Sequence, residues 1–150
     1  MAVNKKLTAS FKNMKRKAWD MPIKNLTRKT TIAKEFRTTK SSMEKAVGFM
    51  FSEPKTALVM AFEKEKNISL HMFFVFGTID VLFLDRNMKV VELKREFRPF
   101  TAYTSGKKAK YAVELPKGSI KKSSTRTGDK LALISISTEK SRAEKKITIK

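Results

Sequence analysis

The chain offers few side chains for catalysis or metal binding. It has no cysteine and a single histidine, His71. We therefore expect no thiolate nucleophile, no cysteine-type zinc site, and no metal or cofactor bound by the chain. The sequence contains no GxSxG elbow, HExxH helix, phosphate-binding glycine loop or GxGxxG turn. Since the standard catalytic motifs are absent, we expect a protein that is not an enzyme.

Three titratable residues nevertheless lie close together in sequence. His71, Asp80 and Asp85 could converge on a small polar pocket. Alternatively, backbone donors satisfy His71 and Asp80, and Asp85 begins a turn. Asp80 lies in an apolar run, where a buried charge requires a partner such as a pair of backbone N–H groups or Arg98. We favour the structural interpretation and keep a pocket near His71 and Asp80 as the alternative.

Binding to phosphate is better supported than catalysis. Residues 94–111, KREFRPFTAYTSGKKAKY, alternate cations with aromatic rings. Cations pair with phosphates, and aromatic faces stack on unpaired bases, each stack contributing about 1–3 kcal/mol. The cations are Lys94, Arg95, Arg98, Lys107, Lys108 and Lys110, and the stacking candidates are Phe100 and Tyr103. The alternative is that Phe97, Phe100 and Tyr111 belong to the core and the lysines form a solvated face.

The N-terminal segment predicts a basic amphipathic helix. Leu7, Phe11, Met14 and Ala18 have the spacing of one helical face, and Pro22 prevents its continuation. Such a helix can lie along an RNA groove, in an anionic membrane interface, or on its own domain. The narrow apolar face favours RNA over lipid. Its cations are Lys5, Lys6, Lys12, Lys15, Arg16 and Lys17, with Trp19 as a third stacking candidate.

A polar loop is predicted over residues 117–130. It adds Lys121, Lys122 and Arg126 among serines and threonines, which suit phosphate oxygens and do not discriminate between bases. The sequence has no zinc-finger spacing, helix-turn-helix or RNP-like aromatic motif. Sequence-specific reading of DNA is therefore not supported.

Composition points to a polyanionic partner. The 150 residues contain 34 Lys and Arg against 14 Asp and Glu, a formal charge of +20. Nucleic acid is the first expectation and an anionic membrane surface the second. The charge is concentrated in residues 1–45 and 94–150, which flank a nearly neutral middle. We find no transmembrane segment and no secretory signal in the sequence and predict a cytoplasmic location.

The predicted fold class is α+β. We expect a mostly antiparallel β-sheet or a small barrel-like domain with one or two short helices, plus the basic N-terminal helix. Two short strands are predicted within residues 23–40 and a short helix over 41–51. Later strands are predicted within 56–66, 68–85, 88–97, 109–116 and 131–138, paired as a meander. The expected division is a basic extension over 1–22, a compact domain over 23–134 and a basic tail over 135–150.

Five sequence runs resemble an uncharacterised family. They are GFMF at 48–51, SLHMFFVFGTIDVLFLD at 69–85, VVEL at 90–93, AKYAVELPKGSI at 109–120 and GDKL at 128–131. In order and spacing they are similar to domain-of-unknown-function family 192, especially its archaeal members. The resemblance implies a compact, mostly antiparallel β domain with one or two short helices, and it supplies no function. Many members are exported or membrane-linked, a pattern from which the basic extensions of this chain depart.

Together these features predict a non-enzymatic RNA-binding protein. We expect an accessory or stable component of a ribonucleoprotein such as the archaeal ribosome, with ribosomal RNA and ribosomal proteins as partners. The alternative is a small-ligand-binding domain or an unrecognised enzyme with its pocket near His71 and Asp80. Association with a membrane surface is a third hypothesis. The oligomeric state is left open.

Overall fold

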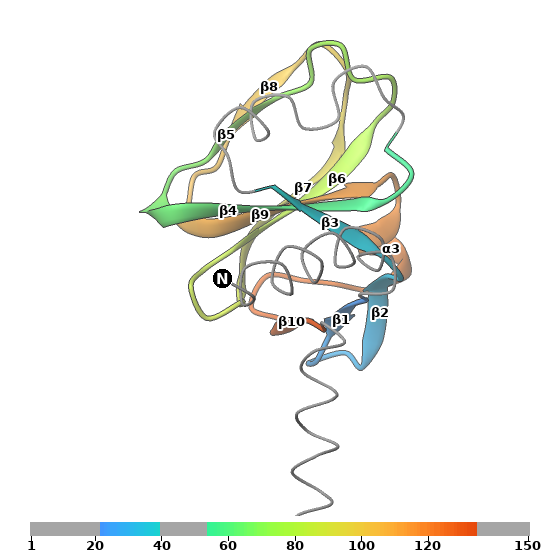
Figure 1. Cartoon of the computed structure of the whole chain (residues 1–150), viewed down its shortest axis with the longest axis vertical. Coiled ribbons are helices and arrows are strands. Elements are labelled where there is room, and N and C mark those ends of the chain that lie inside the picture. The colour runs from blue at the N-terminus through green and yellow to red at the C-terminus, as the bar shows by residue number, and fades with distance from the viewer. Residues whose placement is uncertain (1–21, 40–53, 135–150) are drawn as a thin grey trace, which may run out of the picture.

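The computed structural model describes residues 22–39 and 54–134 (Figure 1). This part of the chain forms ten strands and one short helix, which confirms the expected mostly β fold. The elements are β1 Ile23–Asn25, β2 Thr30–Ala33, β3 Phe36–Thr39, β4 Ala57–Lys66, β5 Ser69–His71, β6 Ile79–Leu84, β7 Val90–Phe97, β8 Ala102–Thr104, β9 Ala109–Pro116, α3 Ser119–Lys122 and β10 Leu131–Leu133.

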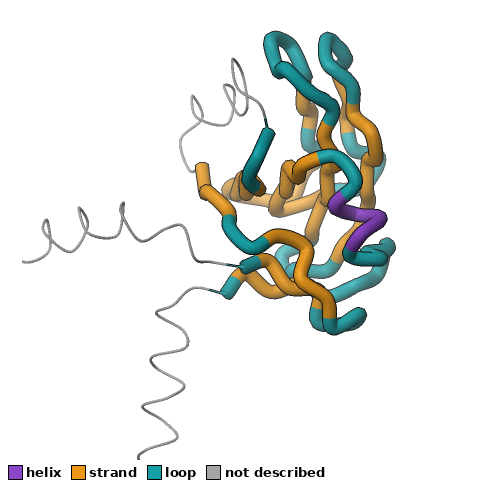
Figure 2. Tube along the Cα trace, turned by 90° about the vertical axis from the view of Figure 1, so that its right-hand side faces the viewer, coloured by secondary structure: helices purple, strands orange, loops and turns teal. Residues whose placement is uncertain are grey.

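The strands form three sheets. The main sheet has the order β3-β4-β9-β6-β7, in which only β3 and β4 are parallel, and it does not close into a barrel. A three-stranded sheet has the order β10-β1-β2, and β5 pairs with β8. Figures 1 and 2 show these two smaller sheets on opposite sides of the main one. The main sheet is therefore the central layer.

Strand β6 explains this layering. All six of its residues are buried. Because side chains alternate along a strand, Ile79, Val81 and Phe83 enter the core beneath β5 and β8, whereas Leu82 and Leu84 enter the core against β1, β2 and β10. An apolar strand with both faces buried needs a covering layer on each side.

The expected meander is wrong. Strand β9 lies between β4 and β6, because the chain leaves the main sheet after β4 and its next strand, β5, pairs with β8. Residues 23–39 form three strands rather than two. The stretch 94–111 also holds one strand more than expected, since β8 follows the predicted strand that ends at Phe97.

Helix α3 lies within the stretch predicted as a polar loop. Its Ile120 is fully buried in the core against β1, β2 and β10, and this burial stabilises a turn whose local sequence carries no helix signal. The helices predicted at the N-terminus and over 41–51, and the tail from residue 135, lie outside the described residues.

Membrane crossing by a helix is not indicated. Within the described ranges, no helix is long and apolar enough to span a bilayer. The apolar run at 68–85 is divided between β5 and β6.

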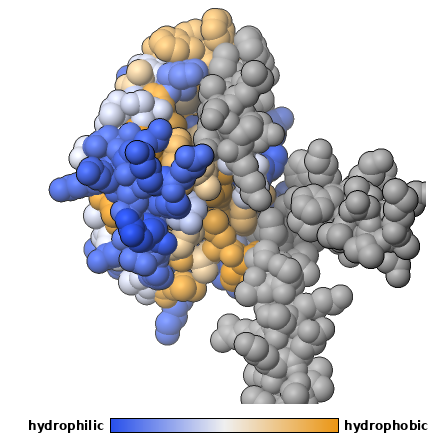
Figure 3. Space-filling model, turned by 60° about the vertical axis from the view of Figure 1, so that its left-hand side comes forward, coloured by the Kyte–Doolittle hydropathy of each residue, from blue (hydrophilic) through white to orange (hydrophobic). Residues whose placement is uncertain are grey.

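Several large apolar side chains remain on the surface. Figure 3 shows an apolar area at the upper end of the molecule, where Figure 1 places the loops around β5 and β8. The exposed large apolar residues in the described ranges are Leu26, Phe73, Phe74, Phe76 and Phe100. Four of the five are phenylalanines from the β5–β6 and β7–β8 loops.

A carboxyl group is buried within the main sheet. Glu114 of β9 is 6% exposed and lies between Leu58 of β4 and Val81 of β6. Burial raises its pKa to about 7. An unfolded glutamate has a pKa near 4.3, so between these values the folded chain holds a proton that the unfolded chain releases. The resulting loss of folding stability is absent below about pH 4.3 and complete above about pH 7.

The substitution Glu114→Gln tests this assignment, because it removes the titration and keeps the shape of the side chain. We expect the free energy of unfolding of the wild type to fall by roughly 3 kcal/mol relative to the variant as pH rises from about 4.3 to 7. Urea unfolding of both proteins at several pH values measures the difference. A difference that does not change with pH would contradict the assignment.

Candidate functional site

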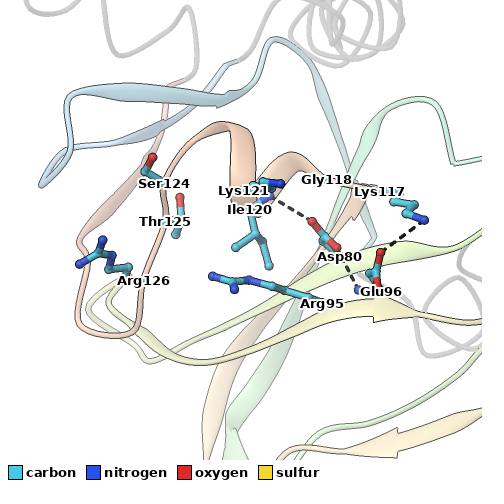
Figure 4. Close-up of a pocket in the computed structure, with 10 residues that line it drawn as sticks. All are labelled: Asp80, Arg95, Glu96, Lys117, Gly118, Ile120, Lys121, Ser124, Thr125 and Arg126. Atoms are coloured by element: carbon cyan, nitrogen blue, oxygen red, sulfur yellow. Dashed lines mark hydrogen bonds and ion pairs between the residues drawn. The ribbon is translucent and has the colours of Figure 1, made fainter.

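A pocket of about 670 Å³ opens where β6, β7 and the segment around α3 meet. Figure 4 shows residues of β7 facing those of residues 117–126 across it. Its charged lining consists of four cations and two carboxylates: Arg95, Lys117, Lys121 and Arg126 with Asp80 and Glu96. Ser124 and Thr125 add hydroxyl groups. The lining is thus polar with an excess of positive charge.

Asp80 holds two walls of the pocket together. Its side chain is almost fully buried, and its two carboxylate oxygens accept hydrogen bonds from backbone N–H groups of different elements. Oδ1 accepts from Glu96 at 3.1 Å, and Oδ2 accepts from Ile120 at 3.1 Å (Figure 4). This agrees with the structural interpretation of Asp80, in which backbone donors satisfy a buried carboxylate. The contacts fix α3 against β7.

The second carboxylate of the pocket is also engaged. Glu96 Oε1 lies 3.3 Å from Lys117 Nζ, and both side chains are about 60% exposed. Such an exposed pair contributes little stability but offsets charge locally. Arg95, Lys121 and Arg126 form no ion pair with any carboxylate of the described residues. Three guanidinium and ammonium groups are therefore available to an anion.

The loop after α3 is fixed by a hydrogen-bond network to β1. Asn25 Nδ2 donates to Thr125 Oγ1 at 3.1 Å and to Asp129 Oδ2 at 2.9 Å. Asp129 also accepts from the backbone N–H of Arg126 at 2.9 Å and from Arg28 Nε at 3.2 Å. Burial by itself raises the pKa of Asp129, but the hydrogen bonds from Asn25, Arg126 and Arg28 outweigh it and lower the pKa. The ionised network holds the backbone of Arg126 in place.

The substitution Asp129→Asn should disrupt this loop. The amide removes the charge and turns N–H groups toward existing donors, so we expect a loss of about 1–3 kcal/mol in the free energy of unfolding at neutral pH. The lowered pKa means that the wild-type contribution is present above the unfolded value of about 3.9 and is lost as pH falls through the folded value. The variant and wild type should therefore converge in acid, as chemical unfolding at decreasing pH can show. A gap that stays constant into acid would contradict the ionised network.

The structure brings together only part of the predicted cationic set. Arg95, Lys121 and Arg126 line the pocket, and Lys122 is exposed on the same short helix. Lys94 and Arg98 line an adjacent hollow along the end of β7. Lys5, Lys6, Lys12, Lys15, Arg16, Lys17 and Trp19 lie outside the described residues.

The lysines before and within β9 line neither hollow. The backbone N–H of Lys107 donates to Glu92 Oε2 at 2.8 Å, and Lys110 Nζ donates to the carbonyl oxygen of Glu63 at 2.6 Å. Lys108 is exposed in the turn between β8 and β9. These three lysines contribute to the overall charge of the domain rather than to the pocket.

His71 and Asp80 do not share a pocket. His71 is exposed at the end of β5, with its ring centroid 5.3 Å from that of Phe73. Asp80 alternates with Ile79 and Val81 along β6, so its side chain points away from the core beneath β5 and β8. The main sheet therefore separates the two residues, which the sequence-based alternative placed together.

The two stacking candidates in the described residues differ in exposure. The Tyr103 ring packs against Phe83 and Phe97, with centroid distances of 6.0 and 6.2 Å, and its hydroxyl donates to Glu92. That ring is partly buried against the core, although the sequence-based alternative named Phe97, Phe100 and Tyr111 as core residues. Phe100 is 65% exposed and presents its ring to solvent.

Sequence reasoning missed the network of Asn25, Thr125 and Asp129. The Gly128-Asp129 pair predicts a turn, but the partner that orders the loop is Asn25, about a hundred positions earlier in the chain. No local spacing could reveal that contact. Lys117 fell within the predicted loop and was not singled out as a pocket residue.

An open β-sheet covered on both faces and carrying a cationic pocket at its edge defines a fold class without defining an activity. The sequence pattern of the family described as Uncharacterized ACR, domain-of-unknown-function family 192, matches residues 24–133. The chain belongs to this family, as the resemblance predicted.

Two archaeal relatives agree with this assignment. The chain is 36% identical over 99 residues to UPF0127 protein PH1112 of Pyrococcus horikoshii, covering 65% of this chain and 85% of the relative. It is 36% identical over 109 residues to UPF0127 protein PF1050 of Pyrococcus furiosus, covering 71% of this chain and 93% of the relative.

Two bacterial structures share the fold. A Sinorhizobium meliloti protein, provisionally described as a transcription regulator, has a TM-score of 0.67 at 16% identity and covers 75% of this chain and 91% of its own. A Novosphingobium aromaticivorans protein of unknown function has a TM-score of 0.65 at 14% identity, covering 75% of this chain and 82% of its own. At these identities the similarity shows the fold alone.

Proposed function

We propose that this protein is a non-enzymatic RNA-binding protein that contacts the phosphate backbone. In this proposal it acts as an accessory or stable component of a ribonucleoprotein such as the archaeal ribosome, in the cytoplasm. Its partners are ribosomal RNA and ribosomal proteins. Neutralisation of phosphates by lysine and arginine, with release of counterions, supplies the affinity.

One observation carries the proposal. Arg95 of β7 meets Lys121 and Arg126 of the segment around α3 at one pocket, where the neighbouring carboxylates of Asp80 and Glu96 are already engaged. The network around Asp129 fixes the loop that carries Arg126. A preorganised group of cations loses less conformational entropy on binding than flexible side chains do.

The charge of the domain supports the same conclusion. The described residues contain 21 Lys and Arg against 9 Asp and Glu, a net charge of +12. The folded domain therefore carries more than half of the +20 of the whole chain. A positive field of this size attracts polyanions and accelerates their association.

The pocket also favours a second candidate function. Its volume of about 670 Å³ falls within the range typical of small-molecule sites, and its cations suit a small anionic ligand. On this alternative, the ligand binds beside Asp80 without His71. Competition between RNA and inorganic phosphate distinguishes the RNA-binding function from the small-ligand function. At fixed ionic strength, only a small-anion site is saturated by phosphate.

Neutralising the pocket cations should weaken RNA binding and reduce its salt dependence. We expect the variant Arg95→Gln, Lys121→Gln, Arg126→Gln to lose affinity for a structured RNA at low salt. The slope of log affinity against log salt should fall by about 0.7–0.9 for each phosphate contact removed. Fluorescence anisotropy across a salt series measures both quantities.

A matched control removes the same number of charges elsewhere. Lys24, Lys34 and Lys64 are exposed and line neither hollow. Their replacement by Gln should change affinity less than the pocket variant does. Equal losses in the two variants would show that RNA responds to net charge alone and would reject the pocket as the interface. RNA binding that does not change between low and high salt would contradict the proposal as a whole.

Association with a ribonucleoprotein can be tested on the endogenous protein. We expect comigration with a ribosomal subunit when lysate is sedimented through a sucrose gradient at low salt, because a stable component remains bound. Ribonuclease treatment and high salt should both release it. Migration as a free protein in every condition would contradict the ribonucleoprotein assignment.

A further inference from the structure

The exposed phenylalanines belong to two loops that are joined by hydrogen bonds. The backbone N–H of Met72 donates to the carbonyl oxygen of Thr101 at 2.8 Å. The backbone N–H of Phe100 donates to the carbonyl oxygen of Met72 at 2.9 Å. These bonds link the β5–β6 loop to the β7–β8 loop. The exposed fractions of the side chains are 47% for Phe73, 49% for Phe74, 59% for Phe76 and 65% for Phe100. The result is one apolar surface at the upper end of the molecule (Figure 3).

The backbone at two of these residues is strained. Phe74 has φ of 58° and Phe100 has φ of 60°, in the left-handed region that bulky side chains rarely occupy. Glycine or asparagine would adopt this conformation more readily. Strained residues of this kind concentrate at functional sites and persist where the surrounding structure holds them in place.

A second hollow connects the cationic pocket to the loop that carries Phe100. This hollow of about 350 Å³ follows the end of β7, lined in part by Lys94, Arg95, Arg98 and Thr101. It shares Arg95 with the pocket beside Asp80, and its Arg98 and Thr101 flank Phe100 in the chain. Cations thus extend from Arg126 through Arg95 to Arg98 and end at an exposed aromatic ring.

We propose that unpaired nucleotides of RNA bind along this path, with phosphates on the arginines and a base stacked on Phe100. The inference rests on the proposed RNA-binding function and specifies the form of RNA that is bound. An uncharged apolar partner would match the phenylalanines but not the adjoining arginines. A single strand matches both, since it presents phosphates and ring faces along its length. A duplex hides its ring faces, so stacking on Phe100 selects single strands.

The test uses the full chain and a short RNA oligonucleotide containing 2-aminopurine, alone and as a blunt duplex. We expect Phe100→Ala to weaken single-strand binding by about 5- to 150-fold, the range that corresponds to one stacked base, and to abolish the change in 2-aminopurine fluorescence. Duplex affinity and the salt slope should not change. Leu26→Ala is the matched control, because Leu26 is 52% exposed, lies between β1 and β2, and should leave both affinities unchanged.

The pocket variant distinguishes failure of this inference from failure of the proposed function. If Arg95→Gln, Lys121→Gln, Arg126→Gln weakens binding and Phe100→Ala does not, phosphate binding stands and the stacking path is overturned. If the wild type binds neither RNA at low salt, the proposed function itself fails. Loss of binding to vesicles of phosphatidylcholine and phosphatidylserine in Phe100→Ala, with RNA binding intact, would assign the surface to lipid and overturn the inference.

A second variant separates binding from packing. Phe100→Gly relieves the left-handed backbone, so we expect its midpoint of thermal unfolding to rise while single-strand affinity still falls. A lower midpoint together with unchanged affinity would assign Phe100 to packing and overturn the inference.

Discussion

Burial of both faces of β6 is the constraint on which the rest of this structure depends. A strand that presents apolar side chains alternately to two sides cannot lie at the surface on either side. The pairing of β5 with β8 supplies one cover, and β10, β1 and β2 supply the other together with α3. Since β9 and β7 flank β6, segments distant in sequence meet around it. The pocket lies where one of these covers reaches the edge of β7.

The surface charge follows from where the carboxylates lie. Asp80 and Asp129 are buried and accept hydrogen bonds that hold α3 and the following loop in place. Two of the few acidic groups of the domain are therefore withdrawn from the surface. No lysine or arginine of the described residues is buried, although Arg28 reaches the buried Asp129 from the surface. Structural use of the acids thus leaves Arg95 and Arg126 facing solvent without a carboxylate partner among the described residues.

Local pattern predicted the elements well where a strand has a clear apolar period. The strands at 57–66, 79–84, 90–97 and 109–116 each match a predicted strand. The predictions of a meander and of a loop without a helix at 117–130 were wrong for one physical reason. Strand order and helix α3 are decided by burial against distant segments, as Ile120 shows, and a propensity read over a few residues does not contain that information.

The sequence by itself determined the family, the mostly β fold, the excess of positive charge and the absence of cysteine. These properties are local or additive, so they can be read without coordinates. Tertiary structure alone decided that His71 and Asp80 lie on opposite sides of a sheet, that Tyr103 is packed while Phe100 is exposed, and that Arg95 meets Arg126. Each of these depends on which face of a strand a side chain occupies and on which distant strand lies beside it, and those are fixed by long-range pairing rather than by spacing along the chain.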